Sequence, residues 1–471
     1  MEKPVKKFQE LLVTVTDLTY GGAGIAHIGN FIIFIKNAIP GQRLMVRITK
    51  IKASYAEARI LEIIEQSPEY QSPPCPYFEH CGGCTHQQLA YKTQLRYLHK
   101  QVLQLYQHLG GFGQVEVLSP IASEDLFRYR NKMEFAFSDK RWLIDELETD
   151  KPKDFALGLR ATGNFLKAID IDDCLIAPEE TRIVLETIRN FSLENSLSCY
   201  NQRSHTGYLR HLVLRKAHKT QQLMINIVTN EDHHEVLSPL VDILSERLPP
   251  LKSVVNTISR SWSGTTFGET QHLLYGKDHI IETLGSFTFK ISPASFFQTN
   301  TIMAEKLYNI IKEYAGLTGT ETVWDLYCGT GSIALYLANR AREIIGFEIV
   351  SSAVKDAREN ANLNQLSNLR FIECDLDRLP QKNPELLDTL PRPQILIIDP
   401  PRAGMHPKLI PVVAKLNPSR IVYISCNPAT QVRDIKLLLE QTIYHIDLVQ
   451  PVDMFPHTPH IEVVTRLEKQ E

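Results

Sequence analysis

The sequence predicts a multidomain protein with a small β-barrel at its N-terminus, an α+β region in the middle and an α/β domain at its C-terminus. The chain has 471 residues, which is about three times the size of an ordinary domain. Short strand patterns separated by Gly and Asn occupy its first part, and alternating strand and helix patterns occupy its last part. A stretch rich in Pro, Gly and Cys separates the first part from the middle.

The composition limits the class of protein and its partners. With 43% hydrophobic and 22% charged residues, the chain is neither disordered nor fibrous. Its 51 Lys and Arg residues against 54 Asp and Glu residues give a net charge of -3. Taken over the whole chain, this balance argues against a partner held only by its negative charge, such as nucleic acid or an anionic membrane surface.

The apolar runs are too short for a membrane protein. FIIFI and ILII are the size of strands, and the basic N-terminus is followed by neither an apolar segment nor a cleavage site. We therefore expect a cytoplasmic monomer that makes no membrane contact. In that reducing compartment the eight cysteines do not form a disulfide framework, so each is a core thiol, a metal ligand or a nucleophile.

Residues 1–66 are expected to form the small β-barrel. The strand patterns are LLVTVTDL, FIIFIK, RLMVRITKI and YAEARILEII, and Gly and Asn mark the turns between them. This segment contains nine Lys and Arg residues and six Asp and Glu residues. The local excess of positive charge is compatible with RNA binding, although a barrel that contacts protein would have the same pattern.

Residues 67–290 are expected to form the central α+β domain. Pro and Gly first interrupt the periodic pattern, and an apolar stretch with helical spacing then ends at Gly110 and Gly111. Alternating runs such as NKMEFAF, HLVLRK and LMINIVTN predict an antiparallel sheet accompanied by helices. Residues 291–471 alternate between strand and helix patterns, and this alternation predicts a mostly parallel, doubly wound sheet of Rossmann-like type.

A cluster of cysteines lies at the start of the central region. Cys75, Cys81 and Cys84 form a C-x5-C-x2-C pattern in a loop, and Cys174 follows in IDIDDCLIAP. Thiolates in this number bind tetrahedral zinc or an iron–sulfur cluster. A second closely spaced Cys or His pair, which zinc sites usually have, is absent, and this favours the iron–sulfur cluster over zinc and over unrelated core thiols.

A glycine turn in the C-terminal region has the features of a nucleotide-type ligand site. TVWDLYCGTGSIALYLA places an apolar strand before Asp325 and the turn of Gly329 and Gly331 before a helix. The pattern differs from G-x-G-x-x-G, which weakens NAD or FAD as the ligand. Glu348, Asp375 and Asp399 end the following strands. Acidic residues there are often helix caps, but the carboxyl ends of parallel strands also line the ligand crevice.

A candidate nucleophile follows another strand of the same sheet. RIVYIS delivers Cys426 in SCNP to the edge where Asp399 begins the stiff turn DPPRAG. A cysteine at a strand end is commonly an inert core thiol, and Glu462 in PHTPHIEVV would by itself be a solvated residue at a strand start. The convergence of the glycine turn, the DPPRAG turn and a thiol on one crevice favours chemistry instead.

Two sets of motifs carry a family resemblance. The turn from Gly22 to His27 and the segment from Ile39 to Ile48 resemble the TRAM domain, an RNA-binding barrel of OB type. ASFFQTN, DLYCGTG, DPPRAG, YISCNP and PHTPHIE resemble the bacterial RNA 5-methyluridine methyltransferases. This resemblance implies a C-terminal class I methyltransferase domain that methylates uridine at ring carbon 5 in RNA with S-adenosyl-L-methionine.

The resemblance also assigns residues and a target. Cys426 is the implied nucleophile and Glu462 the implied base. 23S ribosomal RNA is the implied target, because bacterial members that modify tRNA generally lack both the TRAM domain and the cluster cysteines. Six residues are implied to bind the methyl donor, namely Gln298, Tyr327, Ser332, Glu348, Asp375 and Asp399, and four are implied ligands of a 4Fe-4S cluster, namely Cys75, Cys81, Cys84 and Cys174.

Several alternatives stay open at this point. The protein could be a uridine C5 methyltransferase of tRNA, or a non-catalytic iron–sulfur factor that binds RNA or assists assembly. A methyltransferase of exocyclic amino groups would need an aromatic residue where Arg402 stands. Arg402 itself could contact phosphate or the uracil carbonyl, or pair with a carboxylate. Phe296 and Phe297 could stack on a base or pack in the core.

Overall fold

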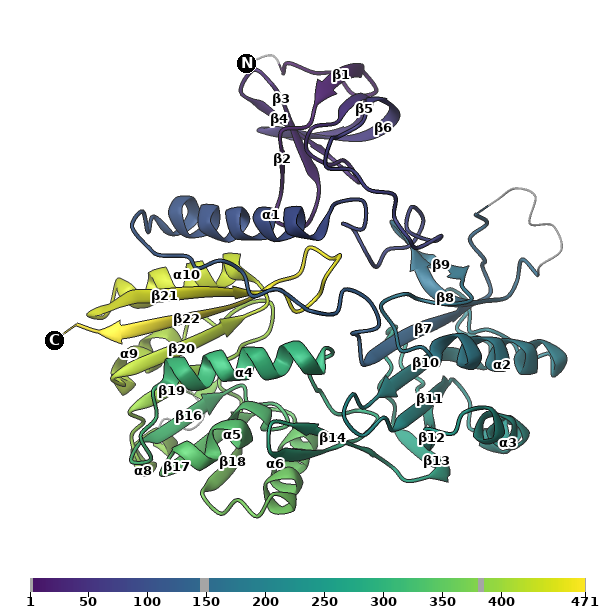
Figure 1. The fold of residues 1–471 in the computed structure, drawn as a ribbon. Coiled ribbons are helices and arrows are strands. Elements are labelled where there is room, and N and C mark those ends of the chain that lie inside the picture. Colours follow the sequence, from purple (N-terminus) through teal and green to yellow (C-terminus); the bar gives the residue numbers. More distant parts are fainter. Residues whose placement is uncertain (1–2, 145–151, 380–384, 471) are drawn as a thin grey trace.

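The computed structural model describes residues 3–144, 152–379 and 385–470. Figure 1 shows three parts: the N-terminal barrel at the top, the C-terminal α/β domain below it, and the central domain beside that domain. Helix α1 (Tyr91–Gln104) runs between the barrel and the C-terminal domain. No helix in the described ranges combines the length and apolar character needed to cross a membrane.

The barrel is a six-stranded sheet in the order β1-β5-β6-β4-β3-β2 around one apolar core. Alternate residues of each strand point inward, as shown by the buried Leu44, Val46 and Ile48 of β5. The predicted small β-barrel is therefore confirmed. Its strands are β1 (Glu10–Thr14), β2 (Asp17–Leu18), β3 (Gly24–Ile28), β4 (Phe31–Ile35), β5 (Arg43–Ile51) and β6 (Tyr55–Glu65).

The central domain is built on a seven-stranded sheet in the order β13-β12-β11-β10-β7-β8-β9. The sheet is antiparallel, as expected, except that β11 and β12 pair in parallel. A parallel pair needs a crossover connection, and helix α3 (Ser238–Arg247) provides it. The strands are β7 (Lys132–Ser138), β8 (Ala156–Ala161), β9 (Asn164–Asp170), β10 (Leu209–Lys216), β11 (Leu223–Thr229), β12 (Leu251–Ile258) and β13 (Thr270–Gly276), with α2 (Thr181–Glu194) and η2 (His234–Leu237) also present.

The C-terminal domain has a second seven-stranded sheet, in the order β18-β17-β16-β19-β20-β22-β21. Its first five strands are parallel, which confirms the predicted doubly wound sheet. The strands are β16 (Thr322–Leu326), β17 (Glu343–Glu348), β18 (Leu369–Glu373), β19 (Ile395–Ile398), β20 (Arg420–Ser425), β21 (Tyr444–Val452) and β22 (Glu462–Lys469). The helices are α4 (Thr301–Ala315), α5 (Ser332–Leu337), η3 (Ala338–Arg340), α6 (Ser351–Leu363), α8 (Leu386–Thr389), α9 (Ile410–Leu416) and α10 (Pro428–Leu439). The hairpin of β14 (Ile280–Leu284) and β15 (Phe287–Ile291) packs against this domain.

The strand order places the site. The chain continues from β16 to β17 and β18 on one side, and it then returns to form β19 on the other side of β16. A crevice opens at the carboxyl ends of the strands where the order reverses in this way. β22 lies between β20 and β21 and runs antiparallel to both. Its first residue therefore lies at the same edge as the last residues of the parallel strands.

The segment that follows the barrel is anchored in the C-terminal domain. Helix α1 continues into η1 (Leu105–Gly110), where Tyr106 is fully buried in the core of that domain. The Tyr106 hydroxyl donates to Gln431 Oε1 at 3.0 Å and lies 2.6 Å from Thr465 Oγ1. The Gln431 amide in turn donates to backbone carbonyls of β20 and β22. The domain boundaries at residues 66 and 290 stay predictions.

We expect Tyr106→Phe to destabilise the C-terminal domain. The substitution leaves Gln431 Oε1 buried without its donor, which lowers the free energy of unfolding by about 1–3 kcal/mol. Urea titration of wild type and variant measures the change. Tyr275→Phe, at a side chain exposed on β13, is the control and should change the value by less than about 0.5 kcal/mol. Equal stability of Tyr106→Phe and wild type would contradict this role of Tyr106.

Candidate active site

The glycine turn after β16 adopts a backbone that only certain residues tolerate. Tyr327, Gly329 and Gly331 all have positive φ, at 64°, 55° and 76°. A Cβ atom at Gly331 would also lie 2.8 Å from the ring of Phe371. Helix α5 begins directly after the turn, at Ser332. The turn can therefore approach a ligand closely.

Glu348, at the end of β17, fixes this turn. Its carboxylate accepts hydrogen bonds from the backbone N–H of Gly329 at 3.0 Å and of Val350 at 2.8 Å. Each carboxylate oxygen has a second lone pair for a further donor. The structure therefore places Glu348 beside the turn, as expected, with capacity left to accept ribose hydroxyls.

The other residues predicted to bind the methyl donor lie around the same edge. Thr330 donates to the backbone oxygen of Phe296 at 3.0 Å, which holds the segment of Gln298 against the glycine turn. The Gln298 side chain is buried. Each of the remaining polar side chains has a contact within the protein: Tyr327 donates to Asp377 at 3.3 Å, Ser332 lies 2.7 Å from the Tyr308 hydroxyl, and Asp375 lies 3.5 Å from Arg378.

Asp325 was not among the six residues expected to bind the methyl donor, but it lies close to two of them, Glu348 and Asp399. The residue is fully buried in β16, and neither of its carboxylate oxygens has a hydrogen-bond partner within the described ranges. Burial, together with the neighbouring Asp399 and Glu348, raises the pKa of Asp325 well above its usual value. A buried carboxyl group without a partner beside a ligand turn indicates a place for a cationic or hydrogen-bonding ligand. This supports the fit of S-adenosyl-L-methionine, which carries both a sulfonium and an ammonium group.

The register of β20 and β22 brings Cys426 and Glu462 together. Ser425 pairs with Val463 in this antiparallel ladder, so the next position along places Cys426 beside Glu462. The two residues predicted as nucleophile and base are therefore neighbours, although they lie 36 positions apart in the chain.

Arg402 opposes the effect of burial on the Cys426 thiol. Burial and the nearby Glu462 carboxylate raise the pKa of Cys426 to about 11, whereas the positive charge of Arg402 and a hydrogen bond from its side chain lower it. Arg402 Nη2 also lies 3.4 Å from His460 Nδ1. The guanidinium therefore stands where it stabilises a thiolate.

Two carboxyl groups at this edge have raised pKa values. Glu462 is buried, and burial together with Asp399 raises its pKa well above its usual value. Burial raises the pKa of Asp399 to about 7. A carboxylate with a raised pKa is a stronger base than an exposed carboxylate.

The N-terminal barrel contributes a side chain to this site. The Tyr20 hydroxyl donates to the backbone oxygen of Cys426 at 3.1 Å, and burial with the nearby Cys426 and Glu462 raises the pKa of Tyr20 to about 12. Helix α1 holds the Tyr20 loop in place through a Lys100–Asp17 ion pair of 2.6 Å and a hydrogen bond from Gln101 to the Thr19 carbonyl of 3.0 Å. No local pattern in the sequence links this turn to a residue 406 positions away.

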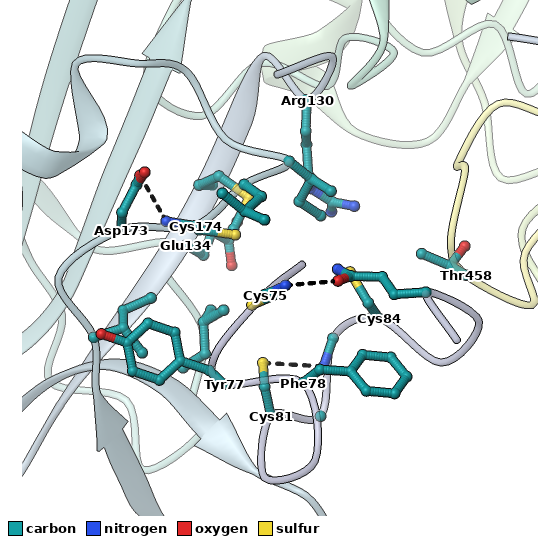
Figure 2. A pocket seen from close by; sticks show the side chains of 18 of the residues that line it. Cys75, Tyr77, Phe78, Cys81, Cys84, Arg130, Glu134, Asp173, Cys174 and Thr458 are labelled. Atoms are coloured by element: carbon teal, nitrogen blue, oxygen red, sulfur yellow. Dashed lines mark hydrogen bonds between the residues drawn. The ribbon is translucent and has the colours of Figure 1, made fainter. Parts of the chain in front are cut away.

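The four clustered cysteines surround one cavity of about 430 Å³. Figure 2 shows Cys75, Cys81 and Cys84 on their loop, with Cys174 approaching from the central domain. All four are free thiols, and Cys81 Sγ accepts the backbone N–H of Gly83 at 3.4 Å. Burial raises the pKa of Cys84 to about 12 and that of Cys174 to about 11, with smaller effects from the neighbouring thiols. A cationic group in the cavity would stabilise the thiolates.

The spacing of the four sulfurs is wider than a single metal ion requires. Within the described ranges, the one group of three or more ligand atoms that lie within 4.8 Å of one another is Asp232, His234 and His272, so the cysteines do not form such a group. Four thiolates around zinc, at about 2.3 Å each, would lie about 3.8 Å apart. The cysteine cavity therefore fits a larger polynuclear centre better than one zinc ion.

The sheet order, the glycine turn and the acidic strand ends define a class I methyltransferase, the fold of S-adenosylmethionine-dependent enzymes. The family model of the tRNA (uracil-5-)-methyltransferases matches residues 219–470, and that of the TRAM domain matches residues 4–61. The chain belongs to the tRNA (uracil-5-)-methyltransferase family of RNA methyltransferases and carries a TRAM domain at its N-terminus.

Related proteins span almost the whole chain. An uncharacterised RNA methyltransferase of Chlorobaculum tepidum is 44% identical over 92% of this chain and 90% of its own, and one of Caldanaerobacter subterraneus is 38% identical over 98% and 99%. The crystal structure of Pyrococcus abyssi tRNA (uracil-54, C5)-methyltransferase with S-adenosyl-L-homocysteine covers 97% of this chain and 99% of its own, with 29% identity and a TM-score of 0.76.

We expect opposite effects on the Cys426 thiol from two substitutions. Arg402→Met removes a positive charge and a donor, which raises the pKa of Cys426, whereas Glu462→Gln removes a negative neighbour and lowers it. At pH 8 the thiol should be alkylated about three- to tenfold more slowly in the first variant and faster in the second. Mass spectrometry of the Cys426 peptide after timed iodoacetamide treatment measures the rates. The Cys374 peptide is the internal control, and a change of the same sign in both variants would contradict the assignment.

Proposed function

We propose that this protein methylates uridine at ring carbon 5 in RNA through a covalent adduct between Cys426 and the target base, with Glu462 as the base that completes the reaction. The observation that carries the proposal is the register of β20 and β22, which makes these two residues adjacent at the edge that also holds the glycine turn. Membership in the uracil-5 family supports it.

We propose that S-adenosyl-L-methionine binds in the crevice at this edge, where it supplies a methyl group on a positively charged sulfur. Glu348 would accept the ribose hydroxyls and Asp375 would meet the adenine edge. The fully buried carboxyl group of Asp325 and the partly buried one of Asp399 would balance the positive charge of the donor. Gln298, Tyr327 and Ser332 complete the six residues of this site. The Pyrococcus abyssi relative, solved with S-adenosyl-L-homocysteine, supports this placement.

The reaction needs a thiol because carbon 5 of uracil is a weak nucleophile. The Cys426 thiolate adds to carbon 6, the carbon 5–carbon 6 double bond breaks, and its electrons move onto carbon 5 and the carbon 4 carbonyl as an enolate. Carbon 5 then forms its bond to the methyl group, and the neutral thioether of the donor leaves. Arg402, which is hydrogen-bonded to the thiol, favours the thiolate that starts the reaction.

Glu462 would remove the proton in the last step of the reaction. The methylated carbon 5 still carries its original hydrogen, and removal of this proton by the Glu462 carboxylate restores the double bond. The carbon 6–sulfur bond breaks in the same elimination, and the thiolate of Cys426 is regenerated. A carboxyl group with a raised pKa suits this task, because its affinity for the proton is high.

The target base must leave its stack to reach the thiol, since Cys426 is partly buried at the sheet edge. The two phenylalanines beside Gln298 differ in their exposure to solvent. Phe297 is 5% exposed and belongs to the core, whereas Phe296 is 62% exposed. Phe296 is thus the side chain available to stack on an unpaired base near the methyl-donor site.

For the target we propose 23S ribosomal RNA, because bacterial members of the family that modify tRNA generally lack both the TRAM domain and the cluster cysteines. The second candidate is tRNA. It is favoured by the Pyrococcus abyssi enzyme, which is named as a tRNA methyltransferase and matches this chain over 97% of its length. The shared architecture supports RNA as the substrate class in both cases.

We also propose that Cys75, Cys81, Cys84 and Cys174 hold a 4Fe-4S cluster. The cavity volume, the wide sulfur spacing and the backbone donor to Cys81 support it. The bound cluster would join the loop of Cys75 to Cys84 to the segment of Cys174 in the central domain. No step of methyl transfer depends on it in this proposal.

Two variants test the covalent mechanism. With labelled S-adenosyl-L-methionine and 23S ribosomal RNA or tRNA transcripts in parallel, we expect the wild type to label the ribosomal transcript. Cys426→Ala should lower the rate about a thousandfold or more, because no adduct can form. Glu462→Gln should form the adduct but fail to release it, so that a protein–RNA band accumulates on a denaturing gel. Methylation by Cys426→Ala at the rate of wild type would refute the mechanism, and labelling of tRNA alone would refute the ribosomal target.

Metal analysis tests the cluster. We expect the anaerobically purified protein to contain about four iron and four sulfide per chain and to absorb visible light. Cys84→Ser should lose both, whereas Cys199→Ser should retain them, because Cys199 is a buried free thiol outside the cysteine cavity. One zinc per chain without sulfide would contradict the proposal.

A further inference from the structure

A broad trough on the central domain, of about 1110 Å³, lies outside the active site described above. Two aromatic side chains at its walls are unusually exposed for their size: Phe165, which is 73% exposed, and Trp262, which is 79% exposed. They come from β9 and from the loop between β12 and β13, respectively. Two large rings that face solvent in the lining of one trough indicate a surface for a ligand with flat faces.

The ring of Trp262 is held in place by its neighbours. It stacks on His205 with a centroid distance of 4.7 Å and an interplanar angle of 11°. His205 Nδ1 in turn lies 2.9 Å from the Tyr200 hydroxyl. The outer face of the indole therefore has a defined orientation before any ligand binds.

A buried arginine fixes the loop that presents Trp262. Arg210 is 2% exposed, and its guanidinium donates to the carbonyl oxygens of Ser259, Ser261 and Ser263 at 2.6, 2.6 and 2.8 Å. It also lies over the ring of Tyr200, 4.2 Å from the centroid. Movement of the loop would leave a buried charge without these acceptors, so the platform of His205 and Trp262 is rigid.

The charge of the trough suits a polyanion. Arg160 and Arg203 line it, and no carboxylate in the described ranges forms an ion pair with either of them. Glu134 also lines it, but its carboxylate lies 2.5 Å from the ammonium group of Lys132. The free charges of the lining are therefore positive, and flat aromatic faces beside positive charges are how single-stranded nucleic acid is bound.

The trough adjoins the cysteine cavity, which in turn lies near the catalytic edge. Gly82, Gly83 and Glu134 line both the trough and the cysteine cavity. Thr458, labelled in Figure 2, and His460 also line that cavity. His460 lies 3.4 Å from Arg402, which contacts the Cys426 thiol. The cysteine cavity therefore lies between the trough and the active site.

We propose that this trough binds a single-stranded segment of the substrate RNA that flanks the target uridine, with bases stacked on Trp262 and Phe165 and phosphates next to Arg160 and Arg203. The inference rests on the proposed function and adds to it a second contact region remote from the reacting base. Discrimination between RNA sequences at this platform is weak, because every base has a flat face.

Binding of a fluorescein-labelled, single-stranded RNA by fluorescence anisotropy tests the platform apart from catalysis. We expect Trp262→Ala to weaken binding about five- to a hundredfold and Trp262→Phe to restore most of it. Phe267→Ala is the matched control, because Phe267 is 59% exposed in the same loop but does not line the trough. The Phe267→Ala variant should bind the RNA with the affinity of wild type.

Methyl-transfer assays on the same variants separate the possible outcomes. In Trp262→Ala the defect should appear as a higher KM for RNA rather than as a lower kcat. Unchanged RNA affinity of Trp262→Ala in an active enzyme overturns the platform and leaves the proposed function standing. If RNA binding depends on Trp262 but the wild type does not methylate uridine, the platform stands and the proposed function is overturned. A dimer that dissociates in Trp262→Ala with unchanged RNA affinity would show that the surface binds a second copy, which also overturns the proposal.

Discussion

The pairing of β22 with β20 is the interaction on which the site depends. A purely parallel sheet would end its strands at one edge but could not begin one there. Because β22 runs antiparallel, Glu462 enters the sheet beside Cys426, at the edge where β16, β17 and β19 deliver Asp325, Glu348 and Asp399. Burial raises the pKa of the two carboxyl groups nearest the thiol, Asp399 and Glu462. Burial also raises the pKa of the Cys426 thiol, whereas Arg402 lowers it.

The three parts of the chain share this edge. The barrel reaches it through Tyr20, whose loop is held by helix α1, and α1 is itself anchored in the core of the C-terminal domain through Tyr106. The barrel therefore contacts the backbone of the proposed nucleophile. Its basic side chains, by contrast, are partly neutralised: Arg43, Arg47 and Lys50 each form an ion pair with a glutamate. The net charge of -3 is consistent with recognition through local contacts and base capture rather than through a general attraction for phosphate.

The sequence was most informative where a pattern is local. Buried apolar runs such as ILII and the glycine turn predicted the parallel sheet and its ligand edge, because period and turn chemistry act over a few residues. The antiparallel expectation for the central sheet missed the parallel pair of β11 and β12, since a helical crossover decides direction and the strand patterns alone do not. Tyr20 and the platform of His205 and Trp262 gave no signal, because their roles come from contacts between distant segments. The role of each site residue stays a prediction from the resemblance, although the structure brings Cys426, Glu462, Glu348 and Asp399 to one edge.

A trapped intermediate tests the central claim most directly. In RNA that contains 5-fluorouridine, the fluorine at carbon 5 cannot leave as a proton, so Glu462 cannot complete the elimination and the methylated adduct should persist. Mass spectrometry of the digested complex should find the peptide of Cys426 joined to a nucleotide that carries one added methyl group. An adduct on another residue, or no adduct in a preparation that methylates ordinary uridine, would contradict the account.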